Sequence, residues 1–368
     1  MNGGNGTMAP SYALAEYFSE KGENAKVFDI MNEANPLGEI LGNIYNYLLR
    51  HNIYYASMYM NFAHRFPIDN FQPYNQIGRN RTAKLIDSEQ PDAIVMICPW
   101  ISKMVIQAVN ISMRKKETKP LLVTNIVDLG EKMATSWINN DVDLTVLPTT
   151  HAEKYLSKHG LDLNKSKVLG VPLHKEFSMG EVKEKEKLKA RNKYGIDEKR
   201  TVISILGGRE GVCNTKLILM RLMRELHDYD YFVQCGLNRK LYTKIDNVNK
   251  TNKNVHPLGF IDSMRELYAL SDVVITKAGA ITVSELTASN VPFILDTCPS
   301  IMPQEYGNIV FVRENELGLI ANTIDEIPAL VRRLVEDRSQ MAKQNDIRRN
   351  IYGTEKIGEL IIKTIKKR

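Results

Sequence analysis

A short glycine turn at residues 277–279 carries the residue types best suited to holding a phosphate group. It follows an apolar, β-branched run at 273–276, which is typical of a buried parallel strand, and a helix is expected to open near Thr282. Such a turn presents free backbone N–H groups and the positive end of the helix dipole to an anion, and Lys277 adds a charge. Glu285, about one turn into the helix, is spaced to accept hydrogen bonds from sugar hydroxyls.

Three further polar residues, Gln304, Glu305 and Asn308, follow the next expected strand at 291–295. The carboxyl ends of neighbouring parallel strands share one rim of an open sheet, where ligands of such sheets bind. A lone turn or a lone glutamate is usually only a turn or a solvated residue. The prediction of a binding site therefore rests on the whole block.

This block resembles the C-terminal half of family 28 glycosyltransferases, of the monogalactosyl- and glucosyl-diacylglycerol synthase type. The residues that carry the resemblance are Gly259, Phe260, Ser271, Asp272, Thr276, Lys277, Ala278, Gly279, Thr282, Ser284, Glu285, Leu286, Pro292, Gln304, Glu305, Tyr306, Gly307 and Asn308. Residues 207–211 are similar to the family's G-G-x-E-G turn, and residues 235–238 to its C-G-x-N loop. The resemblance implies a nucleotide-sugar site between two Rossmann-like domains.

The resemblance further implies UDP-glucose or UDP-galactose as donor, with no cofactor and no metal. Backbone N–H groups of the 208–211 and 278–280 turns, with Lys277, would stabilise the leaving UDP. Glu285 would hold the ribose, and Gln304 and Glu305 the hexose. The implied donor-binding residues are Gly208, Glu210, Gly211, Gly236, Asn238, Gly259, Phe260, Lys277, Ala278, Gly279, Thr282, Glu285, Gln304, Glu305 and Asn308.

The acceptor side departs from the family pattern. Thr7 occupies the position of the histidine in the family's G-x-G-H loop, and a threonine hydroxyl cannot act as a base at neutral pH. The family's threonine-aspartate pair is Thr124-Asn125 here, which leaves Asp128, three residues later, as the candidate base. The implied acceptor-binding residues are Gly4, Asn5, Gly6 and Trp137. For Trp137, a packed core indole is an equally good interpretation.

The N-terminal glycine loop also matches a dinucleotide-binding pattern at Gly4, Gly6 and Ala9, but the strand that should lead into such a loop is absent from the sequence. A strand is expected at 26–30, after the first helix. We therefore expect a first domain that lacks its first, central strand, or a start codon assigned too late. In either case this domain should be the less stable one.

Length and composition fit an ordinary globular protein of two domains, with 368 residues, 43% hydrophobic and 25% charged. We expect an acceptor and membrane-binding domain at 1–175, a donor-binding domain at 196–345 and a basic helix at 346–368 that crosses back to the first. A charged stretch at 183–199 is predicted to be a solvated linker and helix. Asp141 and Asp143 form a D-x-D, which is predicted to be a turn before a strand and not a metal site.

The cysteines are scattered, and no apolar run approaches the ~20 residues of a membrane helix, which together favour a cytoplasmic protein. Residues 348–368 carry seven basic and two acidic residues, or +5 of the net charge of +6. Such a tail fits an anionic membrane surface or a solvated helix end, and no nucleic-acid-binding module is visible. Residues 36–67 are rich in tyrosine and phenylalanine, which predicts either two core helices or a surface that dips into lipid.

The sequence thus predicts the two-domain α/β architecture called GT-B, and a peripheral enzyme on the inner face of the cell membrane. The expected reaction is inverting, metal-independent transfer of a hexose from a UDP-sugar to diacylglycerol. Alternatives are an N-acetylglucosaminyltransferase of the same family that acts on a polyprenyl-linked sugar, a non-catalytic nucleotide-sugar or lipid binder, and an NAD-linked oxidoreductase built on the N-terminal glycines.

Overall fold

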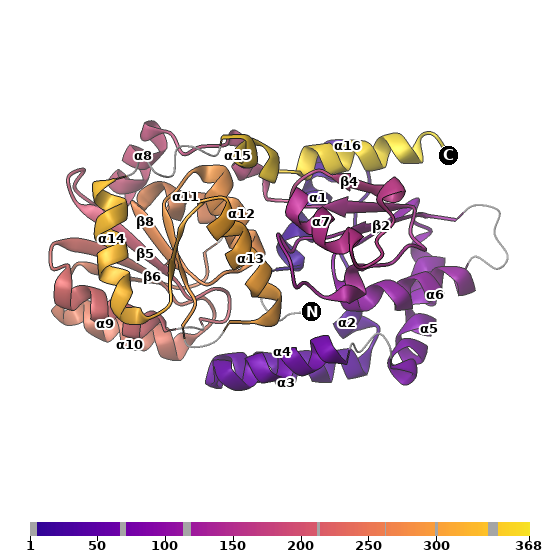
Figure 1. The fold of residues 1–368 in the computed structure, drawn as a ribbon, viewed down its shortest axis with the longest axis horizontal. Helices are drawn as coiled ribbons and strands as arrows, with labels where there is room; N and C mark the ends of the chain where they lie inside the picture. The colour runs from indigo at the N-terminus through magenta and orange to yellow at the C-terminus, as the bar shows by residue number, and fades with distance from the viewer. Residues whose placement is uncertain are drawn as a thin grey trace.

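The computed structural model describes residues 6–66, 71–112, 119–211, 214–261, 263–298, 301–337 and 345–368. Within these ranges the chain forms two parallel sheets that lie side by side along the long axis, each with helices packed on its faces (Figure 1). The predicted α/β fold with two Rossmann-like domains is confirmed.

The C-terminal sheet has six parallel strands in the order β10-β9-β8-β5-β6-β7. The strands are β5 (Thr201–Leu206), β6 (Tyr229–Gln234), β7 (Val255–Leu258), β8 (Val273–Thr276), β9 (Phe293–Asp296) and β10 (Leu319–Ala321). The helices are α9 (Thr215–Glu225), α10 (Arg239–Thr251), α11 (Met264–Leu270), α12 (Ala280–Ser289), α13 (Pro303–Glu314) and α14 (Ile327–Glu336). Every residue of β8 and β9 is buried, as expected for parallel strands covered on both faces.

The N-terminal sheet has four described strands in the order β1-β2-β3-β4, all parallel. The strands are β1 (Ala93–Met96), β2 (Leu121–Asn125), β3 (Leu144–Leu147) and β4 (Ser166–Val168). The helices of this half are α1 (Met8–Glu20), α2 (Ile30–Glu33), α3 (Pro36–His51), α4 (Ile53–Arg65), α5 (Gln72–Glu89), α6 (Ser102–Ser112) and α7 (Thr150–Ser157). β1 therefore lies at the edge of this sheet.

The strand predicted at residues 26–30 is wrong, because residues 23–29 adopt no regular structure and α2 begins at Ile30. A strand needs a partner for its backbone groups. A cavity of about 560 Å³, lined by both Phe28 and the residues of β1, separates this segment from the sheet. Among the described residues, the 26–30 segment therefore has no neighbouring strand to pair with.

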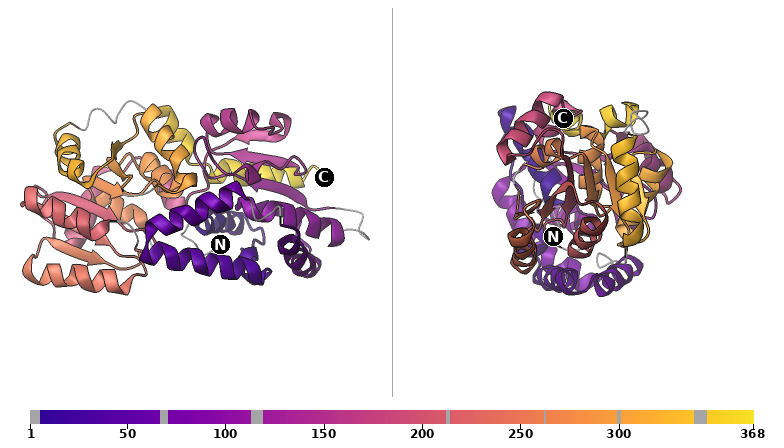
Figure 2. Two further views of the ribbon diagram at one scale, coloured as in Figure 1. Left: turned by 60° about the horizontal axis from the view of Figure 1, so that its bottom comes forward. Right: turned by 90° about the vertical axis from the view of Figure 1, so that its left-hand side faces the viewer.

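α3 and α4 form a helix pair that runs beneath both domains (Figures 1 and 2). Its inner side belongs to a buried cluster that includes Tyr45 and Met60 from the pair and Met302 from the second domain. Ser57 on α4 also donates to the Ile301 carbonyl, at 3.1 Å. Its outer side exposes large apolar side chains: Ile40, Ile44, Tyr47, Tyr54, Tyr55, Met58, Phe62 and Phe66. The core-helix interpretation of residues 36–67 therefore holds for the inner side, and the outer side exposes the aromatic residues on which the membrane prediction rests.

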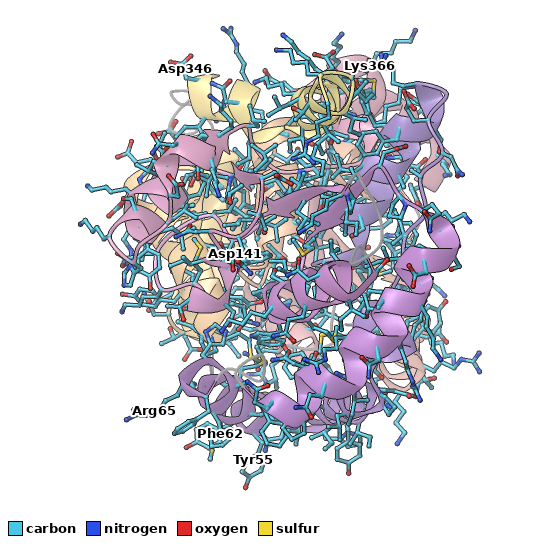
Figure 3. All side chains as sticks on the ribbon, turned by 90° about the vertical axis from the view of Figure 1, so that its right-hand side faces the viewer. Tyr55, Phe62, Arg65, Asp141, Asp346 and Lys366 are labelled. Atoms are coloured by element: carbon cyan, nitrogen blue, oxygen red, sulfur yellow. The ribbon has the colours of Figure 1, made fainter. Side chains whose placement is uncertain are left out.

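Tyr55, Phe62 and Arg65, all on α4, lie along one side of the molecule, and Lys366 in the basic C-terminal segment lies on the opposite side (Figure 3). In the part of the chain that the structure covers, no helix is both long enough and apolar enough to cross a membrane.

The last two helices, α15 (Asn345–Ile351) and α16 (Thr354–Ile365), return the chain to the first domain (Figure 1). Val171 donates to the Ile351 carbonyl at 2.7 Å, which ties the crossing segment to the strand that enters the linker. α16 then packs on α1 so closely that a Cβ on Gly358 would lie 2.2 Å from Cε1 of Tyr17.

The charged stretch between the domains is more than a solvated linker, which corrects that prediction. It contains α8 (Glu184–Tyr194), where Arg191 is buried and pairs with Asp272 at 2.7 Å. Glu186 on the same helix pairs with the buried Arg265 of α11 at 2.8 Å. Because most of the charged residues in this stretch are exposed, the sequence did not indicate the two ion pairs that hold α8 against the second domain.

We expect Gly358→Ala to loosen α16 from α1, because the added methyl group overlaps the Tyr17 ring. Such overpacking costs about 1–3 kcal/mol, which urea unfolding measures directly. The double variant with Tyr17→Ala removes the ring that clashes, so its loss should be smaller than the two single losses added together. Strict additivity would show that the two residues do not meet.

Candidate functional site

The glycine turn after β8 lies against the glycine turn after β5. Lys277 follows β8, and its Cε lies 3.8 Å from the position that a Cβ on Gly208 would take and 3.9 Å from that on Gly279. The N-cap residue of α12 is Gly279, which has no side chain to bond to the first N–H groups of the helix, so these groups remain available. The Lys277 ammonium bonds to the Glu305 carboxylate at 2.9 Å. The residues of the predicted phosphate site thus lie together around Lys277.

The turn after β5 is held in shape by the loop after β6. Gly211 and Gly236 both have positive φ, and a Cβ on Gly236 would lie 2.3 Å from the Gly208 oxygen. Asn238 donates its side-chain amide to the Gly211 oxygen at 3.2 Å. These residues therefore build the turn, whereas a Cβ on Gly208 would meet only the Lys277 side chain within 4 Å. Glu210 is also buried.

Glu285 lies on α12 in a desolvated position. Burial raises the pKa of Glu285 to about 8; the hydrogen bond from the Tyr268 hydroxyl (2.8 Å) lowers it, and the charge of Glu176 raises it further. Thr282 interacts with the same Tyr268 hydroxyl. At neutral pH the Glu285 carboxyl is therefore mostly protonated in the structure.

Glu176 comes from the linker between the domains, in a 3-10 helix at Lys175–Met179. It accepts hydrogen bonds from the Ser263 hydroxyl at 2.7 Å and from the Arg265 backbone at 3.3 Å. Nothing in the sequence marks Glu176 or Tyr268 as site residues, because their placement depends on the path of the linker.

Gln304 and Glu305 open α13, and Tyr45 of the first domain reaches them from α3. Burial raises the pKa of Tyr45 to about 12, and Lys277, Glu305 and the Gln304 side chain all act on its hydroxyl. The Gln304 side-chain oxygen is buried and, among the described residues, has no hydrogen-bond partner. A polar atom left in this state favours a ligand hydroxyl beside it. Sequence reasoning missed Tyr45, since it sits on a helix whose other aromatic residues are mostly exposed.

Asn308 joins the rims of the two sheets. Its side-chain oxygen accepts from the Leu129 backbone at 2.9 Å, and its amide donates to the Ala278 oxygen at 2.8 Å. The side chain is only 1% exposed. Next to it, a Cβ on Gly130 would lie 2.2 Å from the Gly307 oxygen, so the two backbones cross in direct contact. In this structure Asn308 thus links the domains at the position where a donor contact was expected.

Asp128 stands at the first-domain side of this junction, just past β2. Burial raises the pKa of Asp128 to about 6; the hydrogen bond from the Trp137 indole N–H (2.8 Å) lowers it and the charge of Glu305 raises it. Trp137 is 1% exposed, so it supports Asp128 from behind, as a packed indole. Thr124 and Asn125 are fully buried within β2. Asp128 is therefore the carboxylate that this strand end presents.

The remaining predicted residues lie farther from this cluster or outside the description. Thr7 is the N-cap residue of α1 without a side-chain capping bond, and Gly6 has no neighbour within 4 Å of an added Cβ. Gly4 and Asn5 lie outside the described residues. Gly259 and Phe260 follow β7, and Phe260 is exposed. Asp143 accepts from the Leu122 backbone at 2.7 Å at the start of β3.

Two family models match the chain in succession. Residues 8–173 match monogalactosyldiacylglycerol (MGDG) synthase, and residues 202–354 match the glycosyltransferase family 28 C-terminal domain. The chain is 25% identical over 355 residues to a processive diacylglycerol beta-glucosyltransferase of Bacillus licheniformis, covering 95% of this chain and 88% of that protein. It is 28% identical over 341 residues to chloroplastic monogalactosyldiacylglycerol synthase 1 of Arabidopsis thaliana, covering 89% of this chain and 62% of the plant protein.

Solved structures resemble the fold at low identity. MurG of Acinetobacter baumannii gives a TM-score of 0.60 at 15% identity, covering 97% of this chain and 96% of MurG. S. aureus MnaA, solved with UDP, gives 0.62 at 15% identity, covering 98% and 93%. HepE of Anabaena, solved with UDP and glucose, gives 0.54 at 14% identity, covering 78% and 82%. The two domains therefore have the predicted GT-B arrangement.

We expect Glu285→Gln to change how stability depends on pH. The folded-state pKa of about 8 lies above the ordinary 4.5, so stabilisation from this proton is complete below pH 4.5 and is lost as the pH rises through about 8. Relative to the variant, the wild-type free energy of unfolding should fall by up to about 1.4 kcal/mol per pH unit in that window. Urea unfolding across the window measures this.

The matched control is Glu336→Gln, which changes an exposed glutamate. The free energy of unfolding of this variant should differ from that of wild type by the same amount at every pH. A constant difference for Glu285→Gln as well would mean that Glu285 is ionised in the folded protein throughout.

Proposed function

Because the chain belongs to glycosyltransferase family 28, we propose that this glycosyltransferase moves a hexose from UDP-glucose or UDP-galactose to diacylglycerol, with inversion and without a metal ion. The observation that carries the proposal is that Asp128 feels the charge of Glu305, the partner of Lys277, at the point where Asn308 bonds both domains. A candidate base and a candidate phosphate site thus lie on the two sides of one domain junction.

The donor half of the reaction falls to the second domain. The diphosphate of UDP would sit at the turns after β5 and β8, where backbone N–H groups and the Lys277 ammonium balance the charge that develops on the leaving group. Glu285 would take the ribose hydroxyls. Because its pKa is about 8 in the unliganded protein, ribose binding to the carboxylate form would release a proton.

The hexose would lie between Gln304, Glu305 and Tyr45. The unpartnered oxygen of Gln304 and the Glu305 carboxylate are both acceptors for sugar hydroxyls. Tyr45 closes the side that faces the first domain, and its high pKa keeps the hydroxyl protonated as a hydrogen-bond donor. This arrangement supports a hexose without distinguishing glucose from galactose.

Asp128 would act as the general base. It takes the proton of the acceptor hydroxyl as the acceptor oxygen bonds to the anomeric carbon, while the bond from that carbon to the UDP oxygen breaks on the opposite face. A base works best with a pKa near the working pH, and the burial that brings Asp128 to about 6 meets this condition. Trp137 fixes the orientation of the carboxylate.

The exposed aromatic side of α3 and α4 would bring the enzyme to its lipid acceptor. Tyrosine and phenylalanine side chains are favoured at the membrane interface. Figure 3 shows Lys366 of the basic C-terminal segment on the opposite side of the molecule from Tyr55 and Phe62, so a flat membrane that contacts these rings would not reach the tail. We therefore propose peripheral association through apolar contact, at the inner face of the cell membrane.

Asp128→Asn should lower hexose transfer by about 10²–10⁴-fold, because it removes the base without changing the size of the side chain. The assay is transfer of radiolabelled hexose from UDP-glucose and UDP-galactose to diacylglycerol in mixed micelles with EDTA present. For wild type, the rate should fall as the pH drops through about 6, where Asp128 takes up its proton.

Trp137→Phe serves as the matched variant for this prediction. It removes the hydrogen bond that lowers the pKa of Asp128, so the midpoint of the pH profile should move upward. Full activity of Asp128→Asn would exclude Asp128 as the base, and loss of wild-type activity in EDTA would exclude the metal-free reaction.

Tyr55→Ser/Phe62→Ser should weaken binding to vesicles by about tenfold or more. Each ring is exposed in solution, and its burial in the membrane interface would contribute about 1–2 kcal/mol, which the serine loses. Sedimentation with vesicles measures the bound fraction. The control Leu217→Ser/Met220→Ser removes two exposed apolar side chains from α9, in the second domain, and should not change binding.

Lys363→Gln/Lys366→Gln tests the other side of the molecule and should also leave vesicle binding unchanged. If this basic pair controls binding and the aromatic pair does not, the membrane contacts the C-terminal helix and our orientation is wrong.

A further inference from the structure

Trp100 lies in a 3-10 helix, η2 (Pro99–Ile101), at the carboxyl end of β1 in the first domain. Its side chain is only 7% exposed, and its indole nitrogen has no hydrogen-bond partner among the described residues. An indole N–H can only donate, and a buried donor without an acceptor costs free energy. The other tryptophan, Trp137, already donates to Asp128 at 2.8 Å. Trp100 therefore offers a buried donor to a ligand.

One side of this tryptophan adjoins the candidate base. The strands β1 and β2 are neighbours, and η2 packs against the 3-10 helix η4 (Thr135–Trp137), which carries the indole that bonds to Asp128. The thiol of Cys98 lies between the two groups. Burial raises the pKa of this thiol; a hydrogen bond from the Trp100 backbone lowers it, and the charge of Asp128 raises it. Trp100 and Asp128 thus share one rim of the first sheet.

The other side of the indole faces the α3–α4 helix pair through an apolar and uncharged environment. His64, near the end of α4, lies edge-on to the Trp100 ring, with 6.4 Å between ring centroids. Burial lowers the pKa of His64, so its ring is neutral at physiological pH. The buried cluster around Trp100 consists of Met31, Tyr45, Leu49, Ala56, Cys98, Met60 and Met302. A single donor among such side chains suits a ligand that is mostly hydrocarbon and carries an acceptor.

The acyl ester of a glycerolipid has this chemistry. In diacylglycerol the carbon that carries the free hydroxyl is bonded to a carbon that carries an ester, so a hydroxyl at Asp128 brings an ester carbonyl to the rim that Trp100 shares. The carbonyl oxygen accepts a hydrogen bond and needs none in return. A hexose hydroxyl, by contrast, also brings a donor that requires its own acceptor, which an apolar cluster does not supply. The surroundings of Trp100 thus favour the lipid over the sugar.

We propose that Trp100 determines acceptor specificity: its indole N–H donates to an ester carbonyl of diacylglycerol while the acceptor hydroxyl lies at Asp128. This inference rests on the proposed function and deepens it, because it names the part of the acceptor that the first domain recognises. The enzyme would therefore prefer ester-linked glycerolipids to ether-linked ones, which have no carbonyl oxygen at this position.

The first test measures hexose transfer to dioctanoylglycerol and to its ether analogue, dioctylglycerol. For wild type, KM should be lower for the ester by about threefold or more, as expected from one hydrogen bond between neutral groups. Trp100→Phe removes the N–H and keeps an aromatic ring, so most of this preference for the ester should disappear.

Cys98→Ala is the matched control, because it changes the packing of the same buried cluster and leaves the indole N–H in place. It should change KM for the two lipids by the same factor, so the preference for the ester should stay. An unchanged preference in Trp100→Phe overturns the proposal, as does a wild-type enzyme that uses both lipids equally well.

The second test needs neither turnover nor a folded variant. NMR of the wild-type protein reports the indole N–H signals of Trp100 and Trp137 directly. Without any sugar donor, dioctanoylglycerol should shift the Trp100 signal downfield and dioctylglycerol should not.

A selective shift without hexose transfer would refute the proposed function and keep this inference. Equal shifts with both lipids overturn the inference, and so does the absence of any shift. A shift with UDP-glucose and none with dioctanoylglycerol would assign the N–H to the hexose and overturn it as well.

Discussion

The side chain of Asn308 is the contact on which the site depends, because it bonds the loop after β2 of the first domain to the turn after β8 of the second. One end of its amide holds the backbone just after Asp128, and the other end holds the turn after β8. Gly130 and Gly307 allow this approach, since a side chain on either would collide with the other backbone. A base on one sheet and a phosphate seat on another can cooperate only at a fixed separation, and this crossing fixes it.

Three carboxyl groups around that junction differ in charge because their surroundings differ. Glu305 has an ammonium partner in Lys277, at 2.9 Å. Asp128 is desolvated but receives an indole hydrogen bond, which keeps its pKa near neutral. Glu285 is desolvated beside another acid, Glu176, and keeps its proton. A single site can thus offer a base at Asp128 and a protonated carboxyl group at Glu285 at one pH.

Sequence reasoning reached the second domain more fully than the first. A run of β-branched residues, such as 273–276, predicts a buried strand. The turn and helix that follow it are close in sequence, so Lys277 and Glu285 could be placed relative to that strand from their spacing. The contributions of Tyr45 and Glu176 could not, because each reaches the site from a distant segment. Residues 26–30 have the composition of a strand, yet they form none, since a strand exists only when a neighbouring edge accepts its hydrogen bonds. The buried ion pair of Arg191 with Asp272 was likewise not predicted, because it lies in a stretch whose other charged residues are mostly exposed.

α3 brings the two halves of the proposed chemistry within one helix diameter of each other. Its outer side exposes Ile44 and Tyr47, whereas Tyr45 points inward to Gln304 and Glu305. A helix with its side chains is about 10–12 Å wide. A lipid hydroxyl that enters at the outer side would therefore travel about one helix width to reach the hexose, and the glycerol end of a lipid can do so while its acyl chains stay in the membrane. In the proposed orientation, a membrane at the aromatic surface would therefore lie on the same side of the molecule as the helix pair that carries Tyr45, and away from the basic C-terminal helix.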